Sequence, residues 1–562
     1  MGIPYLTKHL LPFAESVVLG PSDSECPSVR DVVIDGPSLV YQVYLRLLAW
    51  SDPSTDVLAV QPTCQQVSVG VLGYLLQLAK LGVQVHGIFF DGALPMSKRE
   101  TRLARLEKSR HRLELFRCIN LPSSGSRSCG VASVQPAQLW RSRSVPTRWK
   151  NIPENPFMVS AVYEDLRCRW TKESIADLHG ELSCCLADFG EHPWAGITVM
   201  APGEADAMCA LVSNQTGAAV LTNDSDLLLH DLGPHGSVVF LDSVQMPGAT
   251  WETVDSDIQG LRLSPHSLAG RLGMPSVQRF AYELKTSPHL RLPELIRKSK
   301  EDLGAQSLPN SYPEFLQEYQ HDLGLSSTGT GRSLDPRVSE LFWQYELPET
   351  YCPMDQPHVY LGILNEDHAR RCAWEDGRFY RSLGYSLFNL SRPSSNQFTL
   401  VHEYVRRGGR IVADQITLAG AKTVDSDLDL LRKRLSLARS AFGNGLSPFS
   451  FWALFALSDI CHHASASWTA PSLERFLARG FMAKRAEWVD HHLLAQIQAV
   501  LYSLRILKQL LEMTTRDSST KSLFGDLPPL HILARSRLEM VGSFSDQDLV
   551  HRLVSCMFHT CC

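Results

Sequence analysis

The chain has 562 residues, with 54 Lys and Arg against 59 Asp and Glu, and a formal net charge of −5 at pH 7. This length predicts two or three domains, and the charge balance excludes a protein that holds polyanions through its overall charge. The 14 cysteines show neither disulfide nor zinc spacing, and no apolar run reaches the length of a signal peptide core or a membrane span, which favours an intracellular protein without a membrane partner.

Two apolar segments in the first hundred residues each end in an acid followed by glycine. Residues 32–34 precede Asp35-Gly36, and residues 83–90 precede Asp91-Gly92. Short apolar runs bounded by turn residues are typical of buried strands. Since Asp-Gly is also ordinary turn chemistry, each acid is informative only in combination with others.

A strongly basic stretch follows Asp91. Its cations are Lys98, Arg99, Arg102, Arg105, Lys108, Arg110 and Arg112, with only Glu100 and Glu107 against them. Lys98, Arg102 and Arg105 recur at helical spacing and share one predicted helix face. A solvated helix face is one interpretation and a phosphate clamp is the other. We favour the clamp, because a cluster of carboxylates needs nearby cations to hold a polyanion.

Residues 120–155 interrupt the alternation of strands and helices. They are rich in Ser, Arg and Pro and include Arg141-Ser-Arg-Ser144, with little periodicity. This composition predicts a disordered or loosely packed insert. Contact of its arginines with RNA or DNA is the functional alternative to a solvated loop.

The most informative stretch is Ala201-Pro-Gly-Glu204-Ala-Asp206, followed by Asp224-Ser-Asp226. Apolar runs at 197–200 and 218–221 precede these acid pairs, with a helical pattern between them. Strand, helix and strand in so few residues predict a parallel βαβ unit. Ligands of open parallel sheets bind outside the carboxyl ends of the strands, where these acids fall.

The acids at the predicted strand ends together form a candidate metal site. Without counter-charge they would repel one another and raise each other's pKa, and bound cations remove that difficulty. Carboxylate oxygens suit Mg²⁺ or Mn²⁺, and a pair of ions suits phosphodiester hydrolysis, in which one ion generates hydroxide and both stabilise the transition state. The predicted ligands are Asp35, Asp91, Glu204, Asp206, Asp224 and Asp226.

The two regions of the chain differ in pattern. Residues 1–250 alternate strands and helices, and residues 251–562 are mostly helical, with a linker predicted near 324–333. The second region shows no catalytic or metal-ligand motif, so we expect it to bind unknown protein partners. Nucleophile-elbow and glycine-rich phosphate motifs are missing from the whole sequence.

These motifs, in this order, resemble the XPG/flap-endonuclease superfamily, whose core is a PIN-like α/β fold built on a parallel sheet. The resemblance covers about the first 230 residues, beginning with Met1-Gly2-Ile3. Pro153-Glu-Asn-Pro-Phe157 and the long second region look most like Asteroid-type proteins.

The resemblance implies a Mg²⁺-dependent nuclease. Its expected location is the nucleus, alone or together with the cytoplasm. Its substrates would be DNA flaps, overhangs or branched ends, in DNA repair, with RNA as the other nucleic acid. It assigns catalytic roles at the scissile phosphate to Lys98 and Arg105, which would also contact nucleic acid, and places Gly2 near the DNA junction. The basic stretch adds Arg99 and Arg102 as candidate nucleic-acid contacts.

The sequence departs from the family after the second acid pair. The family's Gly-x-Asp-Tyr acid and glycine-rich helix–hairpin–helix are missing, and Glu283 is a candidate substitute for the lost ligand. Two hypotheses follow. One is an active structure-specific nuclease, which the retained acids favour. The other is a catalytically weak scaffold that binds protein or RNA in post-transcriptional regulation, which the losses favour.

Overall fold

The computed structural model describes the chain except residues 1–2, 22–25, 53–54, 56, 58, 121–132, 181–184, 248–256, 302–310, 320–333, 353–354, 444, 464–467, 515–517, 545, 547–549 and 556–562. Gly2, the predicted linker at 324–333 and the first part of the predicted insert therefore lie outside the described residues. The predictions made for them stay predictions.

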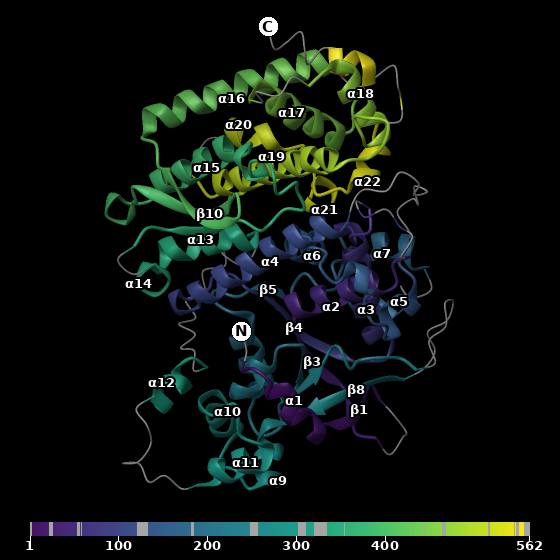
Figure 1. The fold of residues 1–562 in the computed structure, drawn as a ribbon, viewed down its shortest axis with the longest axis vertical. Coiled ribbons are helices and arrows are strands. Elements are labelled where there is room, and N and C mark those ends of the chain that lie inside the picture. Colours follow the sequence, from purple (N-terminus) through teal and green to yellow (C-terminus); the bar gives the residue numbers. More distant parts are fainter. Residues whose placement is uncertain are drawn as a thin grey trace.

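The first region builds an eight-stranded sheet in the order β2-β1-β8-β7-β6-β3-β4-β5 (Figure 1). The strands from β7 to β5 are parallel to their neighbours, and β8 runs antiparallel to both β7 and β1. This arrangement confirms the predicted α/β core. The strand bounds are β1 (Glu15–Leu19), β2 (Ser28–Val29), β3 (Asp31–Asp35), β4 (Gln84–Phe90), β5 (Thr198–Met200), β6 (Ala219–Thr222), β7 (Ser237–Phe240) and β8 (Ile258–Leu263).

The strand order reverses between β3 and β6. From β3 the chain adds β4 and β5 on one side, then returns to place β6 and β7 on the other. Loops leaving the carboxyl ends of β3 and β6 diverge at such a point, which opens a crevice that commonly binds ligands.

The strands of this sheet bury both faces. Val32 and Ile34 of β3 join one hydrophobic core, with α2, α3 and α6, whereas Val33 joins a second core with α8 and α10. This alternation follows from the two-residue period of a strand. The helices of this region are α1 (Leu6–Leu10), α2 (Gly36–Ala49), α3 (Cys64–Lys80), α4 (Arg99–Ile119), α5 (Pro136–Trp140), α6 (Met158–Cys168), α7 (Lys172–Leu178), α8 (Ala205–Thr216), α9 (Pro265–Leu272), α10 (Val277–Thr286), α11 (Leu292–Lys300) and α12 (Ser311–Gln317).

Helices dominate the rest of the chain, as predicted, and a small sheet accompanies them. The strands β9 (His358–Tyr360), β10 (Leu400–Arg407) and β11 (Arg410–Thr417) pair in the order β11-β10-β9. The helices are α13 (Pro336–Glu346), α14 (Pro348–Tyr351), α15 (Arg378–Leu390), α16 (Ala421–Phe442), α17 (Pro448–His463), α18 (Ala470–Arg479), α19 (Trp488–Glu512), α20 (Ser518–Lys521), α21 (Leu530–Leu533) and α22 (Arg537–Val541).

The two regions are packed against each other. The first hydrophobic core continues from the sheet into the buried residues of α15, α17 and α19, while α21 contacts α3 and α6, and α4 contacts β11. In Figure 1, α4 lies between the large sheet and the C-terminal helices. β8 lies beyond residue 250 but belongs to the first sheet, and the division at 250 stays a prediction.

The described part of the predicted insert, residues 133–155, is packed rather than loose. Trp140 and Trp149 are 2% and 0% exposed. Trp140 stacks on Tyr74 of α3 with ring centroids 4.5 Å apart. Burial of two large indole rings anchors these residues in the core, while the residues between the rings are mostly exposed.

Candidate active site

All six predicted acids lie just beyond the carboxyl ends of parallel strands. Asp35 ends β3 and caps α2, and Asp91 follows β4 directly. Glu204 is the N-cap residue of α8 and Asp206 lies in its first turn. Asp224 caps the 3₁₀ helix that follows β6, and Asp226 lies within that helix, η5 (Ser225–Leu229). These acids are called the strand-end acids below.

Two hydroxyl groups fix Asp35. Ser38 Oγ and Thr222 Oγ1 both donate to Asp35 Oδ2, at 2.5 and 2.7 Å, and the Ser38 backbone N–H donates to Oδ1 at 3.2 Å. Thr222 Oγ1 also accepts from the Asp224 N–H at 2.9 Å. The ends of β3 and β6 are therefore connected through one carboxylate.

Sequence reasoning missed both of these residues. Ser38 could have been found, because the third residue of a helix that begins after Asp offers its N–H to the capping carboxylate. Thr222 carries no comparable signal in the sequence, since a polar residue at a strand end is ordinary.

Asp91 is fixed to the start of α8. Its Oδ1 accepts the Ala205 N–H at 2.8 Å, and the Gly92 N–H donates to the Gly203 oxygen at 3.0 Å. A Cβ on Gly92 would lie 1.9 Å from the Ala201 oxygen. Glycine is required there because the two loops approach so closely, and that approach places Asp91 beside Glu204 and Asp206.

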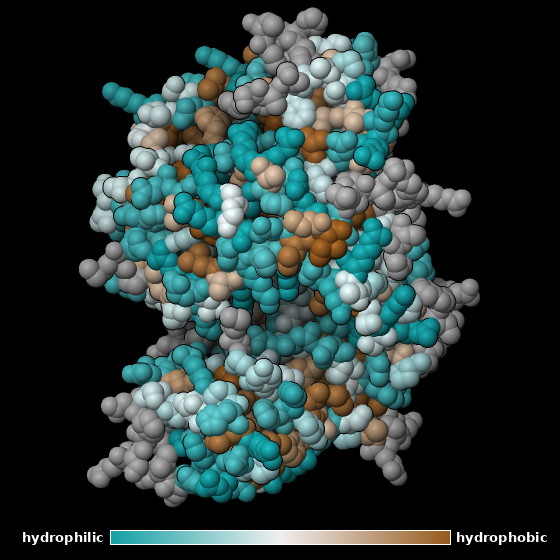
Figure 2. Space-filling model, viewed as in Figure 1, coloured by the Kyte–Doolittle hydropathy of each residue, from teal (hydrophilic) through white to brown (hydrophobic). Residues whose placement is uncertain are grey.

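Asp226 is reached by the beginning of the chain. Its Oδ1 accepts the Ile3 N–H at 3.3 Å, and its own N–H donates to Asp224 Oδ1 at 2.9 Å. Figure 2 shows that the surface is hollowed across the middle of the molecule.

Burial and the charges of neighbouring acids raise the pKa of Asp35, Asp91, Asp206 and Asp226. Burial raises the pKa of Asp206 well above its ordinary value, and the charges of Asp35, Asp224, Asp91 and Glu204 raise it further. Burial and then the charge of Asp224 raise the pKa of Asp226 to about 6. The pKa of Asp91 rises to about 6 through desolvation and the charges of Asp35 and Glu204, against the lowering effect of the Ala205 N–H. Mutual repulsion of this kind destabilises the folded state when no cation is bound.

Lys98 is the cation that the structure brings to these acids. Its Nζ lies 3.4 Å from Glu204 Oε1. Burial lowers the pKa of Lys98, but the charge and hydrogen bond of Glu204, with the charges of Asp226 and Asp206, more than reverse this, so that the pKa is raised. The predicted position of Lys98 over the acids therefore agrees with the structure.

The chemistry of the donor set fits Mg²⁺ or Mn²⁺. All members are carboxylates, several share one electrostatic neighbourhood, and two are buried, Asp35 and Asp226. As the side chains stand, no three described His, Cys, Asp or Glu residues surround a single point closely enough to hold an ion. Like charges separate when nothing balances them, and Mg²⁺ usually keeps several waters and binds one or two carboxylates directly.

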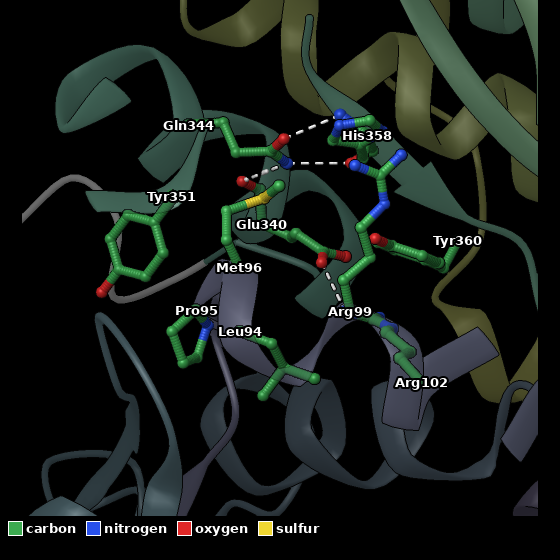
Figure 3. A pocket seen from close by; sticks show the side chains of 10 residues that line it. All are labelled: Leu94, Pro95, Met96, Arg99, Arg102, Glu340, Gln344, Tyr351, His358 and Tyr360. Carbon is green, nitrogen blue, oxygen red and sulfur yellow. Dashed lines mark hydrogen bonds and ion pairs between the residues drawn. The ribbon is translucent and has the colours of Figure 1, made fainter. Parts of the chain in front are cut away.

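The arginines at the start of α4 pair with residues of the C-terminal region. Arg99 Nη1 lies 3.1 Å from Asp355 Oδ2, and the Arg102 guanidinium is paired with the buried Glu340 of α13 and lies 4.3 Å from the centre of the Tyr360 ring. These groups, with Tyr404, are called the arginine clasp. Figure 3 shows the small pocket that Arg99, Arg102, Glu340 and Tyr360 of this clasp line, together with Leu94, Pro95, Met96, Gln344, Tyr351 and His358.

Further along α4, acids of the same chain pair with other cations. Arg110 is paired with Glu107 and Glu114, Arg112 with Glu154, and Arg117 with Asp367. Arg105 and Lys108 are exposed. The prediction of a basic clamp along 98–112 therefore has to be narrowed. Arg105 and Lys108 keep exposed charges that can meet a phosphate, Lys98 pairs with Glu204, and Arg99 and Arg102 hold the C-terminal region.

Glu283 is not brought to the strand-end acids as a replacement ligand. It lies in α10, 2.6 Å from Arg279 Nη2 and 3.6 Å from Lys298 Nζ, and is 6% exposed. Its charge is balanced within α10 and α11.

Comparison with known proteins supports the XPG superfamily. Residues 154–418 match the family described as XPG domain containing. The match begins ahead of α6, includes Glu204, Asp206, Asp224 and Asp226, and ends after β11. It supports a nuclease-like fold that binds nucleic acid. No curated protein matches the chain. Among the described residues, no helix combines the length and the apolar character needed to cross a bilayer.

Proposed function

We propose that this protein hydrolyses phosphodiester bonds of nucleic acid with divalent cations held by the strand-end acids. The observation that carries the proposal is the mutual repulsion of these carboxylates at the switch point of a parallel sheet, with Lys98 as the neighbouring cation. Such an arrangement costs stability unless a cation occupies it.

The chain's own residues divide the task between them. Asp35, Asp91, Glu204, Asp206, Asp224 and Asp226 would hold the ions, and Ser38 and Thr222 keep the Asp35 carboxylate oriented. Lys98 Nζ lies 3.4 Å from Glu204 Oε1, and Lys98 would exchange this partner for an incoming phosphate. Arg105 is exposed, two turns further along α4. When bound, two divalent cations generate hydroxide from water and stabilise the charge of the in-line transition state.

The finer parts of the proposal concern substrate and relatives. DNA flaps, overhangs or branched ends are the proposed substrates and DNA repair in the nucleus the proposed role, with RNA as the other nucleic acid. The Asteroid-type branch is supported by Pro153-Glu-Asn-Pro-Phe157, which is built into the interface between the regions. Phe157 is 2% exposed and packs against Tyr502 of α19.

The test is a cleavage assay on purified protein. Labelled single-stranded, 5′-flap, 3′-flap, overhang and duplex DNA are incubated with Mg²⁺ or Mn²⁺, with Asp226→Asn as the site variant. Asp177→Asn, an exposed acid of α7, is the matched control. Cleavage that is lost in Asp226→Asn and kept in Asp177→Asn is expected. Cleavage that survives equally in both variants would refute the assigned site.

A second candidate function is a scaffold that keeps the nuclease fold and binds protein or RNA. The arginine clasp favours it, because cations predicted to contact nucleic acid are used to fasten the C-terminal region. The two candidates differ in one result. A scaffold binds nucleic acid without cleaving any of the substrates in either metal, even at high protein concentration.

A further inference from the structure

The segment 141–150 displays an exposed group of cations that the proposed active site does not use. Arg141, Arg143, Arg148 and Lys150 are all exposed, and no acid occurs in the segment. The ion pairs of the described residues include none with Arg141, Arg143 or Lys150. In a chain with a net charge of −5, such a group is a local basic patch.

Two buried tryptophans hold this segment, called the basic strap below. Trp140 precedes it and Trp149 lies near its end, at 2% and 0% exposure. The Trp140 oxygen also accepts the Met246 N–H at 3.0 Å. Anchoring at both ends restricts the backbone, so the cations lose less conformational freedom on binding than those of a free loop.

The strap lies beside the C-terminal ends of α2 and α4, two helices that begin near the strand-end acids. The Arg143 guanidinium lies 4.9 Å from the ring centre of Trp50, the C-cap residue of α2. Arg148 Nε lies 3.5 Å from Oδ1 of Asn120, the C-cap residue of α4. α2 begins directly after Asp35, and α4 begins directly after Lys98.

The surface between these ends suits an extended strand. Tyr41 and Leu45 of α2 are 39% and 46% exposed, and Arg105 and Lys108 of α4 are exposed. The Tyr41 hydroxyl is acted on by the charge of Glu154 and then by that of Arg105. Aromatic faces beside cations are the usual components of surfaces that bind single strands.

From these contacts we infer that the basic strap is a second binding site for the phosphate backbone of a nucleic-acid strand, remote from the acids. With 14 residues in α2 and 21 in α4, the strap lies about 21 to 31 Å from the acids along these helices. A strand whose bases stay stacked at about 3.4 Å per phosphate needs roughly 6 to 9 nucleotides to occupy both sites, and a more extended strand needs fewer. The inference takes nucleic acid as the ligand from the proposed function, but it does not depend on catalysis.

The test measures binding without metal. Fluorescence anisotropy follows labelled single-stranded DNA of about 4 and about 20 nucleotides in EDTA, over a range of salt concentrations. The strap variant is Arg141→Gln/Arg143→Gln/Lys150→Gln. The matched control, Arg410→Gln/Lys422→Gln/Lys433→Gln, removes the same charge from exposed positions of β11 and α16. The variant Arg141→Lys/Arg143→Lys/Lys150→Arg retains the charge.

We expect the strap variant to bind the long strand about tenfold or more weakly than the parent protein. The slope of log K against log salt should fall by about 2 in magnitude, because each single-strand phosphate contact contributes about 0.7. The short strand, the control and the charge-retaining variant should change little. Equal affinity of the strap variant and the control for the long strand would overturn the inference, as would tighter binding of polyglutamate than of DNA.

An error in the proposed nuclease function would give a different result from an error in the strap inference. Because no metal or turnover is involved, a parent protein that never cleaves DNA but binds the long strand through the strap refutes only the nuclease. Thermal unfolding of each variant checks that the fold is intact, since these side chains are exposed.

Discussion

The strand-end acids and the cations of α4 lie in the same region of the chain but differ in how their charges are balanced. Most of the arginines of α4 are paired with acids of the same chain, such as Arg102 with Glu340 and Arg112 with Glu154. The strand-end acids are crowded against one another, and Lys98 is the cation closest to them in the described contacts.

The difference separates structural charges from charges that await a ligand. A paired charge is already compensated, so a ligand gains little by meeting it. A cluster of like charges with raised pKa values remains uncompensated until a cation binds. This criterion supports the proposal that the acids bind the ligand, while the start of α4 fastens the C-terminal region.

The largest expected effect comes from breaking the arginine clasp. Arg102→Ala leaves the Glu340 carboxylate buried without its counter-charge, and should lower the free energy of unfolding by about 3 kcal/mol. Urea unfolding measures it. Adding Glu340→Gln should recover much of the loss. Arg297→Ala, which removes an exposed pair with Glu301, should cost less than about 1 kcal/mol. Equal losses for Arg102→Ala and Arg297→Ala would contradict a structural role for the clasp.

The second effect is a dependence of metal-free stability on pH. The pKa of Asp226 is about 6 in the folded protein and ordinarily 3.8. Between these values the folded state holds a proton that the unfolded chain has released, so this stabilisation is present below pH 4 and is lost as pH rises through 6. We expect a loss of about 1 to 2 kcal/mol between pH 5 and 7 in EDTA.

Asp226→Asn removes the titrating group and should lack that part of the pH dependence, and Mg²⁺ should flatten it in the parent protein. Identical pH profiles for the parent and Asp226→Asn, measured by urea unfolding in EDTA, would show that Asp226 is not the group responsible.

The third effect is a gain in the free energy of unfolding, whereas breaking the arginine clasp should cause a loss. Asp206→Asn relieves repulsion among the acids, and should stabilise the metal-free protein at pH 7 by about 1 kcal/mol. The same variant should lose stabilisation by Mg²⁺. Chemical unfolding in EDTA, with Asp177→Asn as the control, measures the gain. A destabilised Asp206→Asn would indicate that the carboxylate is already compensated within the fold.

The smallest effect on stability belongs to Arg105. Because it is exposed, Arg105→Ala should change the free energy of unfolding by less than about 0.5 kcal/mol. Combined with Lys98→Ala it should reduce turnover far more than metal affinity. Parallel losses of turnover and of metal affinity, followed by single-turnover cleavage and by calorimetry, would contradict a role at the phosphate.

The strands and acids of the first region could be predicted because their signals are local. Buried strands such as residues 32–34 read as apolar runs, and an acid after each run falls at the same edge of a parallel sheet. The small second sheet could also have been found. Two alternating segments around Gly408-Gly409 are a hairpin pattern, which was overlooked within a mostly helical region.

Contacts between distant residues could not be predicted in this way. The pair formed by Arg102 and Glu340 joins positions 238 residues apart, and nothing near either residue specifies the other. The packing of Trp140 and Trp149 was hidden for the same reason, since their partners lie on α3 and elsewhere in the core. The sequence could predict which residues carry charge, but not which charges the fold would neutralise.

The most direct test of a metal site at the strand-end acids is thermal unfolding of the parent protein, Asp226→Asn and Asp177→Asn in a Mn²⁺ titration. Binding to the folded state alone stabilises by about 2.7 kcal/mol at a hundredfold excess over Kd. We expect Tm to rise with Mn²⁺ in the parent and in Asp177→Asn, and most of the rise to be lost in Asp226→Asn. A Tm that does not change with millimolar Mn²⁺ in the parent, or that rises equally in all three proteins, would contradict the metal site.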